Sequence, residues 1–212
     1  PYESLNLGIL TDDDQARVAE NRDLLAADIG VEPERVAMGW QVHGADLREW
    51  AEAPSGGGYA SPGAELEKVD GHVTGVPGLG LLVLVADCLP VALIAPGRAA
   101  MLHCGWRPLA AGIVEKALAG FEEPPAAAIG PGIGRCCYEV GEEVLAEFAD
   151  LEGVADGRML DLRMVVRRKL EAAGVVQIED VDLCTSCQED LFFSHRRDNG
   201  VTGRQGGVAW LT

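Results

Sequence analysis

The sequence predicts an α+β protein, a single domain with one large mixed β-sheet and helices packed against it. Its 212 residues are enough for one good-sized core, and 48% are hydrophobic against 24% charged, as in ordinary globular proteins. Segments with strand character and segments with helix character follow one another without strict alternation. This order favours a mixed sheet over a doubly wound parallel fold, and we expect residues 1–212 to form one domain.

The clearest strand covers residues 81–86, a continuous apolar run typical of a strand buried on both faces. Proline is expected to end the regular ladder at Asp87-Cys88-Leu89-Pro90. Residues 91–95 and 99–102 then flank the turn residues 96–98, the pattern of a β-hairpin.

The other elements are predicted from periodicity and from residues that begin or end helices. Thr11 and Asp12 are expected to begin a helix that Gly30 ends, and Asp161 and Gly174 bound another. Helices are expected over residues 11–28, 109–118, 141–148 and 161–173. Strands are expected over residues 35–43, 45–50, 69–74, 126–129, 181–184, 191–194 and 205–211. Residues 53–64, rich in glycine, proline and serine, are expected to form a surface loop.

Charge and apolar patterning limit the class of partner. A formal net charge of −17 argues against nucleic acid and anionic membranes, which both require a basic surface. The sequence contains neither an apolar run of about 18 residues nor a secretory signal pattern. Its six cysteines have uneven spacing, so we expect reduced thiols and a cytoplasmic protein. The sequence makes no prediction of oligomeric state.

Three side chains at predicted strand ends have the chemistry of metal ligands. His43 and His103 each follow an apolar strand and precede glycine, and Cys88 ends a third strand. Two imidazoles and one thiolate suit Zn²⁺ and leave a fourth position for water or substrate. Spacing alone does not select this site, because Cys88 and His103 can equally form the thiolate–imidazole pair of a cysteine hydrolase. A free cysteine can also be no more than a small buried hydrophobe.

The other cysteines give a weaker pattern. Cys184 and Cys187 have the Cys-x-x-Cys spacing of redox and zinc motifs, but we find no second pair of that spacing. A packing role is therefore favoured for them and for Cys136 and Cys137.

Four arginines are candidates for contacts to phosphate, carboxylate or ribose. They lie near predicted strand ends in an otherwise acidic chain: Arg107, Arg196, Arg197 and Arg204. Ordinary ion pairing with the many carboxylates is an equally good explanation for any one of them.

Taken together, several segments resemble the purine nucleoside phosphorylase family of the laccase-domain type, formerly called multicopper polyphenol oxidase. The segments occur in the family's order over nearly the whole chain: Gln41–Gly44 (QVHG), Ala86–Pro90 (ADCLP), His103–Arg107 (HCGWR), Ile129–Val140 (IGPGIGRCCYEV), Cys184-Thr185 and Phe193–Arg197 (FSHRR), then Thr202–Gln205 (TGRQ). The sequence departs from the family at Cys104, where alanine is more common, and at Pro108, where glycine is usual.

The resemblance implies that His43, Cys88 and His103 bind one zinc ion. It also implies phosphorolysis of adenosine, inosine, guanosine or methylthioadenosine, with nucleoside and phosphate as small-molecule partners, and hydrolytic deamination of adenosine. Arg107 or the pair Arg196 and Arg197 would then stabilise negative charge. Asp87, beside the metal cysteine, would orient a histidine or transfer a proton.

Two alternatives accompany this resemblance. The fold is also similar to the catalytic domain of a bacterial toxin that deamidates glutamine, and Cys88 and His103 match its Cys–His pair. An amidase is therefore the second hypothesis, with a peptidoglycan precursor as one substrate class. A copper-dependent polyphenol oxidase ranks behind both, because the chain has only four histidines and no His-x-His pair.

Overall fold

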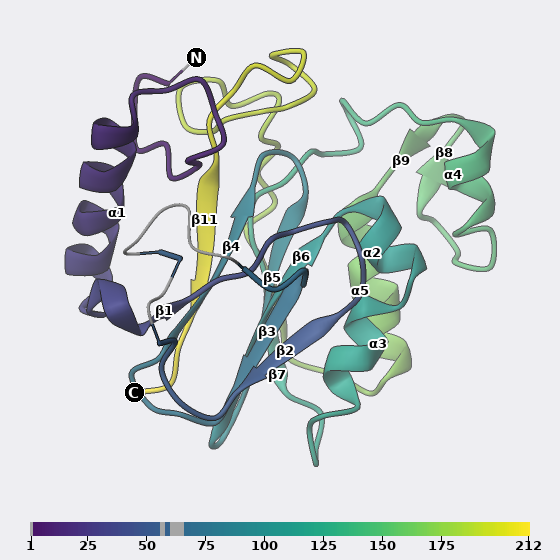
Figure 1. The fold of residues 1–212 in the computed structure, drawn as a ribbon. Helices are drawn as coiled ribbons and strands as arrows, with labels where there is room; N and C mark the ends of the chain where they lie inside the picture. Colours follow the sequence, from purple (N-terminus) through teal and green to yellow (C-terminus); the bar gives the residue numbers. More distant parts are fainter. Residues whose placement is uncertain (1, 56–57, 60–65) are drawn as a thin grey trace.

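Two β-sheets lie face to face between two layers of helix (Figure 1). The structure, a computed structural model, describes residues 2–55, 58–59 and 66–212. The predicted architecture of mixed sheets with packed helices is confirmed, with the difference that the strands divide among three sheets rather than one: the two that lie face to face and a separate two-stranded sheet.

The smaller sheet has three strands in the order β1-β4-β11. The central strand β4 (Gly80–Val85) pairs in parallel with β1 (Val36–Ala37) and antiparallel with β11 (Gln205–Ala209). Helix α1 (Gln15–Ile29), purple in Figure 1, covers its outer face. The smaller sheet is therefore buried between α1 and the larger sheet.

Side chains of β4 alternate between two cores, as a strand buried on both faces requires. Leu81 and Val83 pack between the two sheets, whereas Leu82 packs among residues on the α1 side. This confirms the prediction made from the apolar run.

The larger sheet has six strands in the order β10-β7-β5-β6-β3-β2. Its centre is the predicted hairpin, in which Gly97 has a positive φ of 73°. The six strands are β2 (Leu47–Trp50), β3 (Gly71–Thr74), β5 (Leu89–Ala95), β6 (Arg98–Cys104), β7 (Ala126–Ile129) and β10 (Ile178–Asp180).

Helices α2 (Trp106–Ala110), α3 (Ile113–Leu118) and α5 (Leu162–Ala172) cover the outer face of this sheet and enclose the largest core. The remaining elements are η1 (Pro33–Arg35), α4 (Glu142–Ala146), β8 (Ala155–Asp156) and β9 (Met159–Leu160). Among the described residues, no helix combines the length and apolar character that crossing a membrane requires.

Several predicted boundaries are wrong for local reasons. The first helix begins after Asp14, whose carboxylate caps the amide of Ala16. The helix expected over 109–118 is two short helices, separated at Gly112, whose φ of 81° is left-handed. The strand expected over 181–184 lies at β10 instead. Residues 191–194 form no strand.

The structure also bears on the predictions for Pro90 and for the loop at residues 53–64. Pro90 does not end the ladder but is the second residue of β5, where its carbonyl accepts a bond from Gly130. Residues 56–57 and 60–64 of the expected surface loop lie outside the described residues.

Arg22 in the first helix is buried. Only 2% of it is exposed, and its guanidinium donates to the carbonyls of Leu7, Gly58 and Tyr59. A buried guanidinium is tolerated only with such partners. Arg22 therefore fixes the N-terminal segment and the start of a loop against α1.

The N-terminal segment is joined to the segment before β11. The side-chain carbonyl of Asn6 accepts from the amide of Arg204, 198 positions away, and Leu7 donates to the carbonyl of Arg204. Asn6 also donates to Thr11 and Asp13, which holds those residues outside the helix. The two ends of the described chain thus stabilise one another.

Candidate metal centre

Three segments bring His43, Cys88 and His103 together. Cys88 lies between β4 and β5 and His103 lies near the end of β6; the hairpin register places them as neighbours by pairing Leu89 with Cys104. His43 comes from the turn between β1 and β2. One ligand atom from each residue lies within 4.8 Å of those of the other two.

Asp70 holds two of these segments in place, and it was not predicted as a site residue. It is fully buried, and its carboxylate accepts from the amides of Val42, His43 and Gly44 at 3.0, 2.9 and 2.7 Å. It also accepts from Nδ1 of His103 at 2.8 Å. This bond leaves Nε2 as the nitrogen that can bind a metal, as is usual where a carboxylate orients a ligating histidine.

The turn that carries His43 has its own supports. His43 has a left-handed φ of 59°, and the amides of its turn converge on the carboxylate of Asp70. The Gln41 side chain donates to the carbonyl of Leu84 and accepts from its amide, both at 2.8 Å. The turn is therefore fixed to β4 as well as to Asp70.

Charge interactions couple Cys88 to His103. Burial alone would raise the pKa of the Cys88 thiol, but His103 and His43 outweigh it and lower that pKa to about 6. Burial would lower the pKa of His103, but Cys88 and Asp70 outweigh it and raise that pKa to about 9. Without a metal, the pair is therefore a thiolate and an imidazolium.

Gly105 leaves the space between the ligands open. A Cβ there would lie 2.7 Å from Sγ of Cys88 and 3.5 Å from Cδ2 of His43. The donor set, the carboxylate behind His103 and this cradle fit a zinc ion with a free coordination position. His103 is buried, Cys88 half-buried and His43 exposed, so the site faces solvent on the side of His43.

The other two histidines are elsewhere. His72 lies within β3, fully buried, and its Nδ1 is 3.2 Å from the indole nitrogen of Trp50. His195 is exposed and does not belong to the group formed by His43, Cys88 and His103. The geometry therefore offers two imidazoles and one thiolate for one ion, not the many imidazoles of a multicopper cluster.

Asp87 has a structural part in the site. Its φ of 89° is left-handed, and its oxygens accept from the hydroxyl of Thr185 and the amide of Arg196, both at 2.7 Å. Its backbone carbonyl accepts from Ile133 at 2.7 Å. Among the described residues it is Asp70, not Asp87, that contacts a site histidine.

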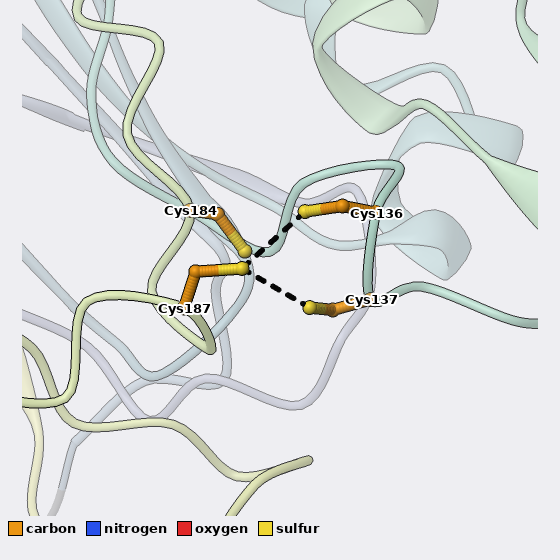
Figure 2. Close-up of side chains that lie close together, drawn as sticks. All are labelled: Cys136, Cys137, Cys184 and Cys187. Atoms are coloured by element: carbon orange, nitrogen blue, oxygen red, sulfur yellow. Dashed lines mark hydrogen bonds between the residues drawn. The ribbon is translucent and has the colours of Figure 1, made fainter.

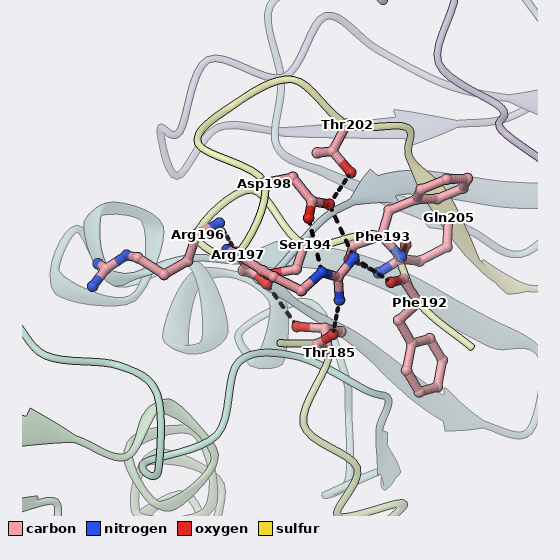
Figure 3. A network of polar contacts seen from close by, with 10 residues as sticks. Thr185, Phe192, Phe193, Ser194, Arg196, Arg197, Asp198, Thr202 and Gln205 are labelled. Atoms are coloured by element: carbon pink, nitrogen blue, oxygen red, sulfur yellow. Dashed lines mark hydrogen bonds and ion pairs between the residues drawn. The ribbon is translucent and has the colours of Figure 1, made fainter. Parts of the chain in front are cut away.

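The four arginines differ in what they can contact. Each of the three side-chain nitrogens of Arg197 donates within its own loop region, to Asp198, Phe192 or Thr185, which gives it a structural role (Figure 3). Arg196 points away from this network and is exposed, as is Arg107. Arg204 donates through one terminal guanidinium nitrogen to the carbonyls of Thr202 and Gly203. Burial lowers the pKa of Arg204, and the negative charge of Cys88 opposes that shift.

Tyr138 is a site residue that the sequence did not single out. Its ring lies 5.2 Å from the guanidinium of Arg196. Burial and the charge of Cys88 raise its pKa to about 12, although Arg196 and Arg107 oppose the shift. The hydroxyl therefore stays protonated at neutral pH and can donate a hydrogen bond.

Comparisons with known proteins agree with this geometry. A family model described as multi-copper polyphenol oxidoreductase laccase matches residues 1–212. The chain is 41% identical to purine nucleoside phosphorylase SCO2081 of Streptomyces coelicolor, covering all of this chain and 89% of that protein. It is 36% identical to purine nucleoside phosphorylase YfiH of Escherichia coli, covering all of this chain and 88% of that protein.

Solved structures show the same fold. YlmD from Geobacillus stearothermophilus superposes with a TM-score of 0.92 at 35% identity, over all of this chain and 87% of that one. A YfiH protein from Bacillus licheniformis also gives a TM-score of 0.92, at 31% identity with the same coverage. The chain therefore belongs to the family described as multi-copper polyphenol oxidoreductase laccase, whose similar members are named purine nucleoside phosphorylase.

Proposed function

We propose that residues 1–212 act as one domain, a zinc-dependent enzyme that cleaves purine nucleosides with phosphate. The observation that carries the proposal is the convergence of His43, Cys88 and His103 on one point, with a buried carboxylate behind His103. Relatives named purine nucleoside phosphorylase supply the reaction class. The proposed substrates are adenosine, inosine, guanosine and methylthioadenosine, and hydrolytic deamination of adenosine is included.

His43, Cys88 and His103 would hold the zinc ion, which would supply Lewis acidity to an oxygen of the attacking phosphate or water. By accepting from Nδ1, Asp70 orients the ring of His103 so that Nε2 is the nitrogen that would bind the ion. Gly105 keeps the space between Cys88 and His43 open.

Side chains around the centre would bind the phosphate and the developing charge. The exposed guanidinium of Arg196 lies 5.2 Å from the ring of Tyr138, the exposed guanidinium of Arg107 is near enough for its charge to lower the pKa of Tyr138, and a guanidinium binds phosphate in a bidentate manner. The protonated hydroxyl of Tyr138 can donate to the same anion. Asp87 holds the backbone of Arg196 in place and is proposed to act through that contact rather than on the substrate.

The test is an assay of the purified protein with inosine and phosphate, following hypoxanthine release and zinc content together. Hypoxanthine release that requires both phosphate and bound zinc supports the proposal. Arg196→Ala should raise the KM for phosphate at least tenfold. Arg168→Ala is the matched control, because Arg168 lies on α5 and pairs with Glu171. Turnover of nucleosides by metal-free protein would contradict the zinc requirement.

A parallel assay with adenosine separates the two proposed reactions. Deamination yields inosine without phosphate, whereas phosphorolysis yields free adenine only with phosphate. If adenosine gives neither product while inosine is cleaved, the deaminase part of the proposal is wrong.

A Cys–His amidase is the second candidate, because one observation favours it. His103 contacts Asp70 through Nδ1, and one of its ring nitrogens lies within 4.8 Å of Sγ of Cys88, which is the order of a nucleophile, a base and an orienting carboxylate. This candidate predicts activity on an amide that survives a chelator and is abolished by alkylation of Cys88. Loss of activity on chelation, restored by zinc, would exclude it.

A further inference from the structure

Four cysteines outside the candidate metal centre form a second cluster. Cys136 and Cys137 lie in the loop after β7, and Cys184 and Cys187 lie after β10. Their sulfur atoms all lie within 4.8 Å of one another, and Figure 2 shows them pointing into the space between the two loops. Sγ of Cys187 is 3.5 Å from that of Cys136 and 3.4 Å from that of Cys137.

The backbone brings these loops together. Gly132 forms a parallel bridge with Cys184, and its carbonyl accepts from the amide of Thr185 at 3.0 Å. The amide of Gly134 donates to Sγ of Cys184 at 3.2 Å. A Cβ at Gly134 would lie 3.1 Å from Cβ of Cys184 and 3.2 Å from Sγ of Cys136, so glycine permits this close approach.

The Cys-x-x-Cys segment is folded as a tight turn. The amides of Cys187 and Gln188 both donate to the carbonyl of Cys184, at 3.2 and 3.0 Å. This turn directs both thiols of the segment to the side on which Cys136 and Cys137 lie (Figure 2). The adjacent pair Cys136 and Cys137 thus supplies the second pair of thiols.

Packing does not explain this cluster. Cys104 shows what a packed cysteine looks like here, since it is fully buried in the largest core. Cys136 and Cys187 are exposed instead. Exposed thiols gain nothing from burial of apolar surface, so a different interaction must account for four sulfur atoms that gather at the surface.

The spacing of the sulfur atoms fits a tetrahedral ion. Zinc bound by four thiolates has zinc–sulfur distances of about 2.3 Å, which places neighbouring sulfur atoms roughly 3.8 Å apart. The two distances of 3.4 and 3.5 Å and the limit of 4.8 Å lie around that value. A disulfide would require ~2.05 Å and would join only two of the four. Four sulfur ligands in tetrahedral arrangement are typical of zinc and of iron–sulfur centres.

We infer that Cys136, Cys137, Cys184 and Cys187 bind a second zinc ion, which has a structural role. This ion would join two loops that meet at Asp87: Ile133 of the first loop donates to its carbonyl, and Thr185 of the second donates to its carboxylate. Asp87 directly precedes Cys88. The second ion would thus stabilise the backbone from which the cysteine of the first metal centre projects.

The number of zinc ions per chain tests this inference. The protein, purified with zinc under reducing conditions, should contain two ions per chain by native mass spectrometry. The double variant H43A/H103A should keep one, and C137S/C187S should also keep one. Cys104→Ala is the matched control, because Cys104 belongs to neither cluster, and it should keep two.

Zinc-edge X-ray absorption identifies the ligands independently. In H43A/H103A the remaining zinc should have four sulfur neighbours at about 2.3 Å. This measurement does not require C137S/C187S to fold. The inference is wrong if the wild-type protein holds a single zinc ion that C137S/C187S leaves unchanged. It is also wrong if the four thiols form a disulfide under reducing conditions or hold iron in place of zinc.

Discussion

Asp70→Asn tests whether the buried carboxylate positions the metal centre. The substitution keeps the size of the side chain but replaces one acceptor oxygen by an NH₂ group. In the wild type, one carboxylate oxygen accepts from His43 and His103, and the other accepts from Val42 and Gly44. Whichever oxygen the NH₂ group replaces, it faces two groups that are themselves hydrogen-bond donors, so those two groups lose their acceptor.

The magnitude follows from these contacts. Two buried donors without an acceptor cost about 1–3 kcal/mol each, so the free energy of unfolding should fall by roughly 2–6 kcal/mol. If the NH₂ instead faces His103, the ring can accept through Nδ1 only by moving its proton to Nε2, which then cannot bind zinc. Loss of a carboxylate behind a ligating histidine typically lowers metal affinity by about 10–100-fold.

Two measurements check this prediction: urea unfolding, and competition for zinc against a chromogenic chelator. Asp46→Asn is the matched control, because Asp46 lies in the connection between β1 and β2 that carries His43, but its side chain is exposed and pairs with Lys116 at 3.6 Å. It should change both quantities little. If Asp70→Asn binds zinc and unfolds like the wild type, Asp70 does not position His103 and the reasoning fails.

Three further substitutions test other parts of the structure. Gly105→Ala should lower the zinc occupancy of the centre formed by His43, Cys88 and His103 at least tenfold with the fold retained, because its Cβ would lie 2.7 Å from Sγ of Cys88. Metal analysis should then find about one zinc ion per chain at the four cysteines; two ions per chain would contradict this. Burial lowers the pKa of His72 to about 4 from its ordinary 6.5. The free energy of unfolding that the neutral ring supports above pH 6.5 is therefore lost as the pH falls, by about 2 kcal/mol between pH 7 and 5. His72→Gln, compared by urea unfolding at both pH values, should lose correspondingly less. Arg22→Met should lower the free energy of unfolding by about 3 kcal/mol or more, because it leaves three buried carbonyls without their donor; an unchanged urea midpoint would refute that role.

Strong local patterns predicted the elements at the centre of the fold. The apolar run of β4, the hairpin of β5 and β6 and the capped helix α5 were all predicted near their observed bounds. Residues 191–194 failed because the backbone of Phe193 bonds to the side chain of Gln205 instead of a neighbouring strand. Strand propensity alone does not reveal such a partner.

The candidate site could likewise be predicted from the sequence only in part. Resemblance to a family brought His43, Cys88 and His103 together in advance, whereas the spacing of these residues left the choice open. Asp70 was seen only as part of a strand, although a carboxylate among apolar residues before Gly71 was a usable signal of a buried, paired charge. The cysteine cluster could not be predicted, because its two pairs meet only through the bridge between Gly132 and Cys184.

The bonds between Asn6 and Arg204 have a consequence for synthesis of the chain. These bonds cannot form until residue 204 has left the ribosome, since 198 positions separate the two groups. Contacts of such separation form late and slow folding. Arg204 is therefore fixed only after the residues before it have emerged, so a chain that stops short of residue 204 would carry His43, Cys88 and His103 without this contact.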